Sequence, residues 1–262
     1  MDQGKKFGFT ILGSGSSGNA TVIHCPGGNL LLDAGFSLKE LTNRMKLSDI
    51  SPDSIRALLI THEHQDHLSG CRLFADTYQI PAYMTVSTAR RARIKNLDAK
   101  DMVLIQPGSR FELCGVMVEP FSVSHDVDTV AFTFSVDDLK FGYATDVGKA
   151  NMLFINKLTD CNALVLESNY DLERLKASRR PLNLKHRIMG ISGHLSNEAS
   201  VSLFGDLLTE RTRDVVLAHL SRECNCPEIV RTLAEDTLHL LHREDVCLHL
   251  ASQDKPLETI WI

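Results

Sequence analysis

The segment THEHQDH, which begins at Thr61, gathers side chains that can bind metal ions. These side chains are His62, His64, Asp66 and His67. Alternate residues of an extended segment point to the same side, so His62 and His64 can share one ion. A turn after the glutamine would direct Asp66 and His67 toward a second ion. Imidazole and carboxylate groups suit Zn²⁺, Mn²⁺ or Fe²⁺. Three of the chain's 11 histidines lie in this segment, which favours a metal site over a polar loop.

One loop cannot complete two metal sites, so further ligands are expected elsewhere in the chain. Three candidates each come directly after an apolar run that is typical of a strand. They are His125 in VSHD, Asp146 in YATD and His219 in LAHLS. Because strand ends can meet at one edge of a sheet, we interpret all three as metal ligands rather than as structural polar residues.

The elements that position these residues are short and numerous. Strand-like runs are expected at 7–12, 20–25, 29–35, 57–61, 115–124, 129–136, 139–146, 162–168, 214–220 and 246–250. Helical periodicity is expected at 38–45, 68–77, 151–158, 197–208 and 228–242, with Ser196 or Asn197 as one helix cap. These patterns predict a single α/β domain over residues 1–262, rich in antiparallel strands, with helices covering the sheets.

The segment LGSGSSGNA carries a G-x-G-x-x-G pattern at Gly13, Gly15 and Gly18, and Asp33 follows about twenty residues later. This pattern is typical of dinucleotide-binding loops, which must open a helix. The residues that follow, NATVIHC, instead predict a second strand. We therefore expect no nucleotide cofactor.

Composition narrows the remaining classes of protein. The chain has 262 residues, of which 43% are hydrophobic, and a net charge of −5. It contains no apolar run of membrane-spanning length and no signal peptide pattern. Its seven cysteines are scattered, which predicts reduced thiols and a cytoplasmic protein. The Cys224–Cys226 pair is weak evidence for a metal. Two basic stretches, at 89–95 and 174–187, could contact phosphates or form solvated helix faces.

The order H-x-H-x-D-H, distal His, Asp and final His resembles the metallo-β-lactamase-fold hydrolases over nearly the whole chain. The resemblance implies a four-layer αββα sandwich with a two-metal site, holding Zn²⁺ or Mn²⁺ with iron as an alternative. It also implies that Asp33 in LLDAG is a buried residue that braces the histidine loop. The implied ligands are His62, His64 and His125 for the first ion, Asp66, His67 and His219 for the second, and Asp146 as the bridge.

The segments LVLESN, GHLSNEA and LAHLS resemble the ribonuclease Z-like nucleases of this superfamily, in which Glu167 and His194 would serve proton transfer. Together with GSGSSGNA, THEHQDH and ATDVG they resemble most closely the YycJ/WalJ-type exonucleases. The chain departs from that family at Gln65, where Ser is expected, at Tyr170, where His is expected, and near 224–226, where the family has an Asn pair. These departures bear on substrate contacts.

The predicted function is metal-dependent phosphodiester hydrolysis by an activated hydroxide, most simply as a DNA exonuclease. Its catalytic residues would be His194, Glu167 and Asp66, with nucleic acid as the partner and no membrane association. In the glycine loop, Ser14, Ser16, Ser17 and Asn19 are candidate phosphate contacts, and a plain hairpin loop is the alternative. A small-molecule phosphodiesterase, a thioester hydrolase and a non-enzymatic metal-binding module remain open.

Overall fold

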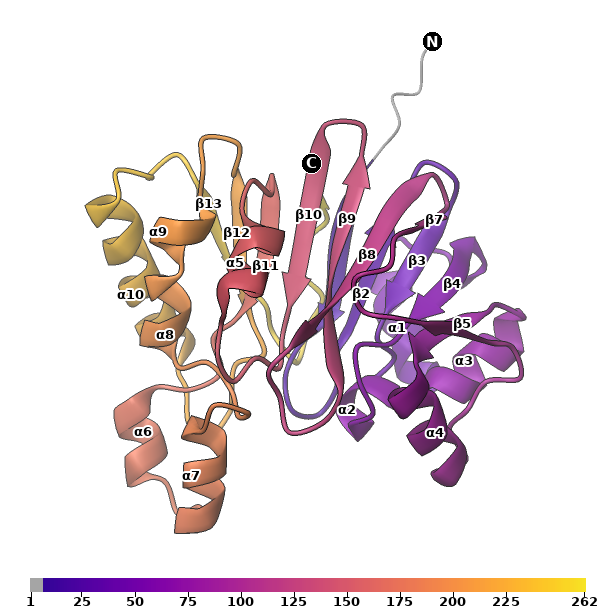
Figure 1. Ribbon diagram of the computed structural model, residues 1–262, viewed down its shortest axis with the longest axis horizontal. Coiled ribbons are helices and arrows are strands. Elements are labelled where there is room, and N and C mark those ends of the chain that lie inside the picture. Colours follow the sequence, from indigo (N-terminus) through magenta and orange to yellow (C-terminus); the bar gives the residue numbers. More distant parts are fainter. Residues whose placement is uncertain (1–6) are drawn as a thin grey trace. The chain divides into compact units, whose positions relative to one another are not determined.

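The computed structural model describes residues 7–262 (Figure 1). In the described residues the strands form two seven-stranded sheets. The order of the first is β14-β1-β2-β3-β4-β5-β6, and that of the second is β13-β12-β11-β10-β9-β8-β7. The chain divides into two compact units. Among the described residues, unit 1 comprises 7–120, Phe134–Asp138 and Ser252–Ile262, and unit 2 comprises Phe121–Thr133 and Leu139–Ala251.

Unit 1 holds the first sheet and the helices of the N-terminal half. Its strands are β1 (Gly8–Gly13), β2 (Ala20–His24), β3 (Asn29–Leu32), β4 (Ile55–Leu59), β5 (Ala82–Thr85), β6 (Met102–Ile105), β7 (Phe111–Leu113) and β14 (Ile260–Trp261). Its helices are α1 (Leu38–Leu47), a 3-10 turn (Pro52–Ser54), α2 (Gln65–Leu68), α3 (Cys71–Tyr78) and α4 (Val86–Ile94). Strands β1, β2 and β3 are antiparallel, whereas β3 to β6 are parallel.

The core of unit 1 forms where α1, α3 and α4 cover one face of the sheet. Leu41 of α1, Phe74 of α3 and Ala92 of α4 are fully buried in one apolar cluster with strand residues such as Leu31 and Leu58. Helix α4 begins at Val86 because the Thr85 side chain accepts a hydrogen bond from the Thr88 amide. Parallel strands packed beneath helices end at one sheet edge, where their following loops meet.

Unit 2 contains most of the second sheet. Strands β8 (Val116–Val123) and β9 (Thr129–Val136) contribute residues to both units, and β10 (Leu139–Ala144), β11 (Ala163–Glu167), β12 (Asp214–Ala218) and β13 (Cys247–Leu250) are parallel to one another. The helices are α5 (Met152–Leu158), α6 (Leu172–Ala177), α7 (Leu182–Met189), α8 (Asn197–Ser202), α9 (Phe204–Leu207) and α10 (Pro227–Leu240). Ser196 caps α8 by accepting from the Ala199 amide, as predicted.

Two apolar clusters stabilise unit 2. The larger one packs α5, α8, α9 and α10 against the parallel strands, with Phe154 and Phe204 fully buried. The smaller one joins α6 to α7 through Leu175 and Ile188. Figure 1 shows these two short helices as a hairpin set apart from the other helices of the unit. The buried Lys185 ammonium closes the hairpin by donating to the carbonyls of Lys176 and Ser178.

The structure differs from the sequence expectation in three respects. The expected prevalence of antiparallel strands is wrong within β3–β6 and β10–β13, because helical crossovers join the successive strands of each group. Strands β5, β6, β7 and β14 are not among the expected strands. Helices α4, α6 and α7 were not in the expected helical ranges, although a solvated helix face was one of the two interpretations of the basic stretches at 89–95 and 174–187. Helix α4 buries only the small side chains of Thr88, Ala89 and Ala92, so its sequence lacks a stripe of large apolar residues.

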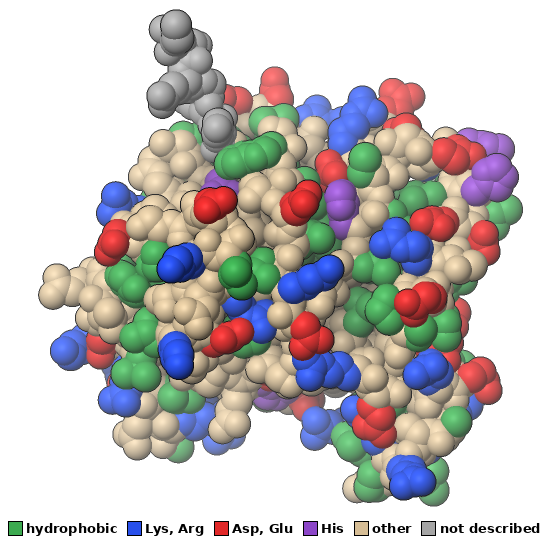
Figure 2. Space-filling model, turned by 180° about the vertical axis from the view of Figure 1, so that it is seen from behind, with side chains coloured by type: hydrophobic (Ala, Val, Ile, Leu, Met, Phe, Trp, Pro, Cys, Tyr) green, Lys and Arg blue, Asp and Glu red, His purple; other side chains and the backbone are tan. Residues whose placement is uncertain are grey.

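Charge is distributed without one dominant sign on the face shown in Figure 2, where basic and acidic side chains are interspersed. Within residues 7–262, no helix combines the length and apolarity that crossing a bilayer requires. The expected single-domain organisation stays a prediction.

Arg44 of α1 ties the glycine loop to the C-terminal segment of unit 1. One guanidinium nitrogen donates to the carbonyls of Leu12 and Gln253, both at 2.9 Å, and Nε contacts Glu40. We expect Arg44→Ala to lower the free energy of unfolding by about 3 kcal/mol, because two buried carbonyls lose a charged donor. Urea denaturation measures this change. The exposed Arg72→Ala serves as the control, and equal stability of both variants would contradict the assignment.

Candidate active site

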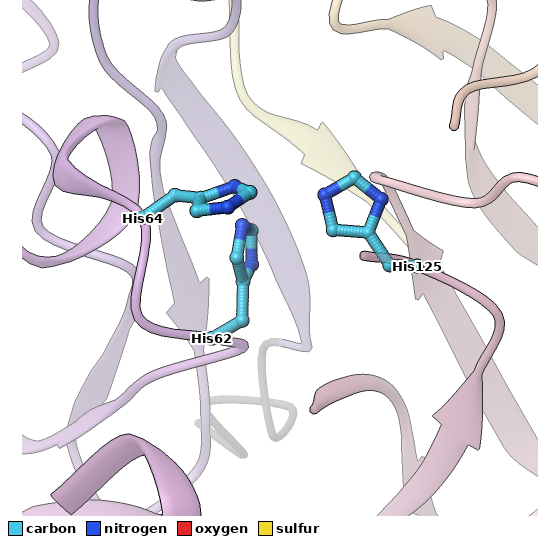
Figure 3. A group of neighbouring side chains, drawn as sticks. All are labelled: His62, His64 and His125. Atoms are coloured by element: carbon cyan, nitrogen blue, oxygen red, sulfur yellow. The ribbon is translucent and has the colours of Figure 1, made fainter. Parts of the chain in front are cut away.

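Residues 61–67 of unit 1, which carry four of the predicted ligands and are called the metal-binding loop below, begin one residue after strand β4. The short helix α2 begins at Gln65, and His64, with an extended backbone (φ −66°, ψ 150°), is its N-cap residue. The turn that the sequence predicted is therefore one turn of helix. The ring centroids of His62 and His64 lie 4.6 Å apart, and those of His62 and His67 lie 4.1 Å apart. Figure 3 shows the first pair extending from this loop.

Asp33 follows the neighbouring parallel strand β3 directly, and its side chain fixes the metal-binding loop. Its Oδ1 accepts from the Thr61 amide (2.8 Å), and its Oδ2 lies 2.7 Å from His67 Nδ1. Burial raises the pKa of Asp33, and the contacts with His67 and Thr61 oppose this rise. Since a carboxylate only accepts hydrogen bonds, Nδ1 of His67 carries the proton and Nε2 presents its lone pair.

The Thr61 hydroxyl extends the same arrangement to His62. It lies 3.0 Å from each oxygen of Asp33 and 3.0 Å from His62 Nδ1. The Thr61 hydroxyl has one proton, which it donates to the Asp33 carboxylate. The hydroxyl oxygen therefore accepts a hydrogen bond from His62 Nδ1. His62 therefore also presents Nε2. Sequence reasoning missed Thr61, although its place between the strand and the first histidine is a usable signal.

The glycine loop joins the antiparallel strands β1 and β2 as a hairpin. The strand that the sequence predicts after this loop is therefore confirmed. Ser14 and Asn19 are buried, whereas Ser16 and Ser17 are exposed. Asn19 Oδ1 accepts from Ser14 Oγ and from the Gly15 amide, both at 2.9 Å. The Asn19 amide nitrogen on the main chain donates to the Asp66 carbonyl (2.7 Å). Asn19 thus positions α2, and the hydroxyls open to solvent are those of Ser16 and Ser17.

The second group of predicted residues lies at the carboxyl ends of adjacent parallel strands in unit 2. Asp146 follows β10, Glu167 is the last residue of β11, and His219 follows β12. Asp146 and His219 have positive φ values of 60° and 58°, which turn the chain sharply after each strand. In this unit, Asp146, Glu167, His194 and His219 each place one potential ligand atom within 4.8 Å of the others.

Glu167 is fully buried and holds two histidines through one oxygen. Its Oε1 lies 2.8 Å from Nδ1 of His194 and 2.8 Å from Nδ1 of His219. Its Oε2 accepts from the amides of Val147 and Leu195, both at 3.0 Å. Burial would raise the pKa of Glu167, but His194 and the two histidine hydrogen bonds lower it to about 2. An ionised Glu167 therefore directs Nε2 of both rings away from itself.

His194 and His219 differ in exposure. The side chain of His194 is 20% exposed, whereas that of His219 is 3% exposed. His219 is also fixed through its carbonyl, which accepts from Asn169 Nδ2 (2.8 Å). Burial lowers the pKa of His194, but Glu167 outweighs this effect and the net direction is upward. His194 is thus held in place at Nδ1 while its other edge reaches solvent.

His125 lies two residues beyond β8 and is labelled in Figure 3. Its Nδ1 lies 3.0 Å from the Gly193 carbonyl, which can only accept, so Nε2 is again the atom presented. In unit 2, Asp146 Oδ1 lies 3.9 Å from that Nε2. The loop before His194 is fixed by the Ser124 hydroxyl, which donates to the Ile191 carbonyl (2.6 Å).

The donor set fits divalent metal ions. Metal-binding histidines almost always donate their second ring nitrogen to a carboxylate or carbonyl, and three predicted ligands have Nδ1 so engaged: His67, His125 and His219. In a fourth, His62, the Thr61 hydroxyl takes this place. Asn19 Nδ2 lies 3.0 Å from His67 Nε2. An ion on that nitrogen would replace this bond, and the amide would keep the Gly15 carbonyl as an acceptor (3.1 Å).

Helix α4 also contacts the metal-binding loop, which sequence reasoning did not anticipate. Arg91 Nε lies 3.4 Å from the Glu63 carboxylate, and Lys95 Nζ donates to the Glu63 carbonyl (2.9 Å). Residues i and i+4 share a helix face, so one face of α4 lies on the loop. The basic segment at 89–95 is thereby beside the predicted ligands His62 and His64.

Comparison with known proteins identifies the fold and the family of this chain. Residues 28–220 match the family model for the beta-lactamase superfamily domain. Among solved structures, the metallo-β-lactamase fold protein YhfI from Bacillus subtilis superposes with a TM-score of 0.71 at 14% identity, covering 96% of this chain and 99% of that one. The predicted α/β metallo-β-lactamase fold, with two mixed sheets and helices, is confirmed.

Two curated relatives are more similar in sequence. The exodeoxyribonuclease YycJ of Bacillus anthracis is 32% identical over 233 residues, covering 88% of each chain. The exodeoxyribonuclease WalJ of Streptococcus pneumoniae (strain D39) is 32% identical over 228 residues, covering 85% of each chain. The chain therefore belongs to the beta-lactamase superfamily and, within it, to the family of the YycJ and WalJ exodeoxyribonucleases. It is an enzyme, a hydrolase of the metallo-β-lactamase fold.

Asp33→Asn tests whether this carboxylate braces a metal ligand. The amide can no longer accept at both oxygens, so His67 loses its fixed orientation, and we expect metal affinity to fall 10- to 100-fold. Metal content after dialysis against graded chelator, measured by mass spectrometry, reports this change. The exposed Asp53→Asn is the matched control. Unchanged metal retention in a folded Asp33→Asn protein would show that Asp33 serves the fold alone.

Proposed function

We propose that this enzyme hydrolyses phosphodiester bonds of nucleic acid, with DNA as the substrate and exonuclease as the mode of action. The observation that carries the proposal is the Glu167 carboxylate, whose Oε1 contacts both the buried His219 and the partly exposed His194. This arrangement suits a metal ligand beside a proton donor. The similarity to two exodeoxyribonucleases supports the choice of DNA.

We assign the ligands as the sequence predicts, with both units acting as one functional domain. His62, His64 and His125 would hold one Zn²⁺ or Mn²⁺ ion, Asp66, His67 and His219 would hold the other, and Asp146 would bridge them. Two such ions supply a hydroxide nucleophile at neutral pH and offset charge on the phosphoryl oxygens. The support is the donor chemistry of each unit and the engaged Nδ1 atoms described above.

His194 is the proposed proton donor to the leaving oxygen. Its Nδ1 is held by Glu167 at 2.8 Å, so the proton would leave from Nε2, on the exposed edge of the ring. As the bond between phosphorus and the leaving oxygen breaks, that oxygen takes this proton, and water later returns one to the ring. Glu167 orients the imidazole and stabilises its charged form. Asp66 is assigned as a ligand that also orients the attacking group.

The hairpin of α6 and α7 is proposed to contact the phosphate backbone. Residues 171–187 carry six basic and two acidic side chains, a net charge of +4 in a chain of net charge −5. Arg174, Arg179 and Arg187 are exposed. The C-terminal end of α7 leads into the His194 loop, where the His194 amide donates to the Ile188 carbonyl (2.9 Å). A bound backbone would thus lie beside the proposed proton donor.

A cytoplasmic location is part of the proposal. All seven cysteines are free thiols, including the Cys224–Cys226 pair, as a reducing compartment favours.

A nuclease panel tests the proposed function directly. Metal-free protein is reloaded with Mn²⁺, Zn²⁺ or Mg²⁺ and incubated with 5′- and 3′-labelled DNA and RNA, single- and double-stranded. We expect DNA to be shortened from an end with at least one metal. Bis-p-nitrophenyl phosphate and a glutathione thioester are included as competing substrates. Turnover of these small substrates, without cleavage of any nucleic acid, would contradict the proposal.

His194→Ala tests the assignment of the proton donor. Loss of a general acid typically slows turnover 10²- to 10⁴-fold, and we expect a decrease of this size with metal content near that of the wild type. His186→Ala, an exposed histidine of α7, is the control. Loss of metal from the His194→Ala protein would show that this histidine is a ligand instead.

The basic hairpin is tested by the salt dependence of binding. Each phosphate contact contributes about −0.9 to the slope of log K against log salt for duplex DNA. The double variant Arg174→Ala/Arg179→Ala should reduce the magnitude of the slope by about 2, as measured by fluorescence anisotropy between 50 and roughly 200 mM salt. Arg72→Ala/Arg231→Ala is the matched control. An unchanged slope would exclude the hairpin from the phosphate path.

A further inference from the structure

A cavity of about 520 Å³ lies in unit 1, and none of the predicted metal ligands lines it. Its wall includes Tyr83 of β5, Phe111 of β7, Leu104 of β6 and Val86, the first residue of α4. Tyr83 and Phe111 lie nearly parallel, with ring centroids 5.6 Å apart and an interplanar angle of 9°. The two rings are therefore stacked on each other, and this aromatic pair forms one wall of a cavity with an apolar rim.

The apolar rim is open to solvent. Leu104 is 57% exposed and Val86 is 50% exposed, although both are large apolar side chains on the surface of unit 1. The exposed side chains of Gln106, Arg110 and Glu112 also line the cavity. The Arg110 Nε is paired with the Glu119 carboxylate (3.1 Å), so the Gln106 amide is the uncharged hydrogen-bonding group beside the aromatic wall. An aromatic wall with a few polar groups is typical of a site that receives a planar ligand.

Helix α4 connects this cavity to the metal-binding loop. Its first residue, Val86, lines the cavity, and near its other end Lys95 contacts the loop at Glu63. At 1.5 Å per residue the helix spans about 12 Å. A stacked strand advances about 3.4 Å per nucleotide, so this span corresponds to roughly three or four nucleotides.

The exposed side of α4 carries positive charge along this path. Arg90 and Arg93 are exposed, and the segment 86–97 contains four basic residues and no acidic one. Single-stranded nucleic acids bind where a basic groove follows the backbone and aromatic side chains stack with the bases. The charge of α4 thus complements a polyanion, and the aromatic wall complements its bases.

We propose that this cavity is a nucleobase-binding site, in which an unpaired base of the substrate extends the stack formed by Tyr83 and Phe111 while α4 holds the intervening phosphates. The inference rests on the proposed function, because it assumes a nucleic acid substrate. The stacked base belongs to a nucleotide about three or four positions from the bond that is cut. The site accepts any base, since every base offers an aromatic face.

The direct test is a fluorescent base that is quenched by stacking. A phosphorothioate-linked single strand of about ten nucleotides carries 2-aminopurine at one position in each version and is titrated with metal-loaded protein. We expect quenching at one or two internal positions only. Phe111→Ala should raise the dissociation constant about tenfold, as expected for the loss of one stacking contact. Uniform quenching, or quenching at no position, would overturn the proposal.

A second variant keeps the test decisive if Phe111→Ala fails to fold. Leu104→Glu places a negative charge at an exposed rim position, and Leu240→Glu, at a 78% exposed position of α10, is its matched control. We expect the ratio of oligonucleotide turnover to bis-p-nitrophenyl phosphate turnover to fall at least fivefold in Leu104→Glu only. Equal ratios would overturn the proposal, as would a change of oligomeric state in Leu104→Glu with unchanged quenching.

The outcomes separate this inference from the proposed function. Quenching measures binding and does not require cleavage. Quenching by a protein that cleaves no nucleic acid would therefore contradict the nuclease assignment and support the base site. Cleavage of nucleic acid without quenching at any position supports the nuclease assignment and overturns the base site.

Discussion

The buried carboxylate of Glu167 is the interaction on which the candidate site of unit 2 depends. A fully buried, ionised side chain is costly unless all its oxygens are hydrogen-bonded, and Glu167 meets this condition with two histidines and three main-chain amides. The amides belong to the loops after β10 and before α8, so the carboxylate joins three segments that are distant in sequence. Removing it would leave these loops and both imidazoles without a common partner.

Unit 1 repeats the same physical solution with Asp33. This buried carboxylate lies at the end of a parallel strand and engages a histidine through Nδ1, as Glu167 does. In both units the strand ends bring the ligands together, and the carboxylate decides which ring nitrogen faces outward. The tautomers of His67 and His219 therefore follow from the fold before any metal is bound.

Most residues of the candidate site could be predicted from the sequence, because metal-binding residue types occur in short, recognisable patterns. The THEHQDH segment and the strand-end positions of Asp146 and His219 could be found from residue type and strand propensity. The burial of Asn19 could not, because its role depends on the Asp66 carbonyl, which is distant in sequence. Helix α4 could not be predicted because its buried side chains are small. The contact of the basic segment 89–95 with Glu63 could not be predicted either, because Glu63 is distant in sequence.

The hairpin of α6 and α7 shows the same limit. Its sequence is dominated by basic residues, and its small core needs Tyr170 and Cys224, which lie outside the hairpin. The positions at which the sequence is expected to depart from the related exonucleases, Tyr170 and the segment around Cys224, therefore meet in one apolar cluster. This cluster supports the hairpin and contains none of the proposed ligands or His194.

The central claim is that the protein engages Nδ1 of the predicted histidine ligands, through a carboxylate at His67 and His219, a carbonyl at His125 and the Thr61 hydroxyl at His62, so that these histidines would bind metal through Nε2. A crystal structure of the Mn²⁺-loaded protein with anomalous data collected at the manganese edge tests this most directly. The account predicts anomalous peaks next to Nε2 of His62, His67, His125 and His219, with Nδ1 still bound to its protein partner. Peaks next to Nδ1, or peaks at other residues, would contradict it.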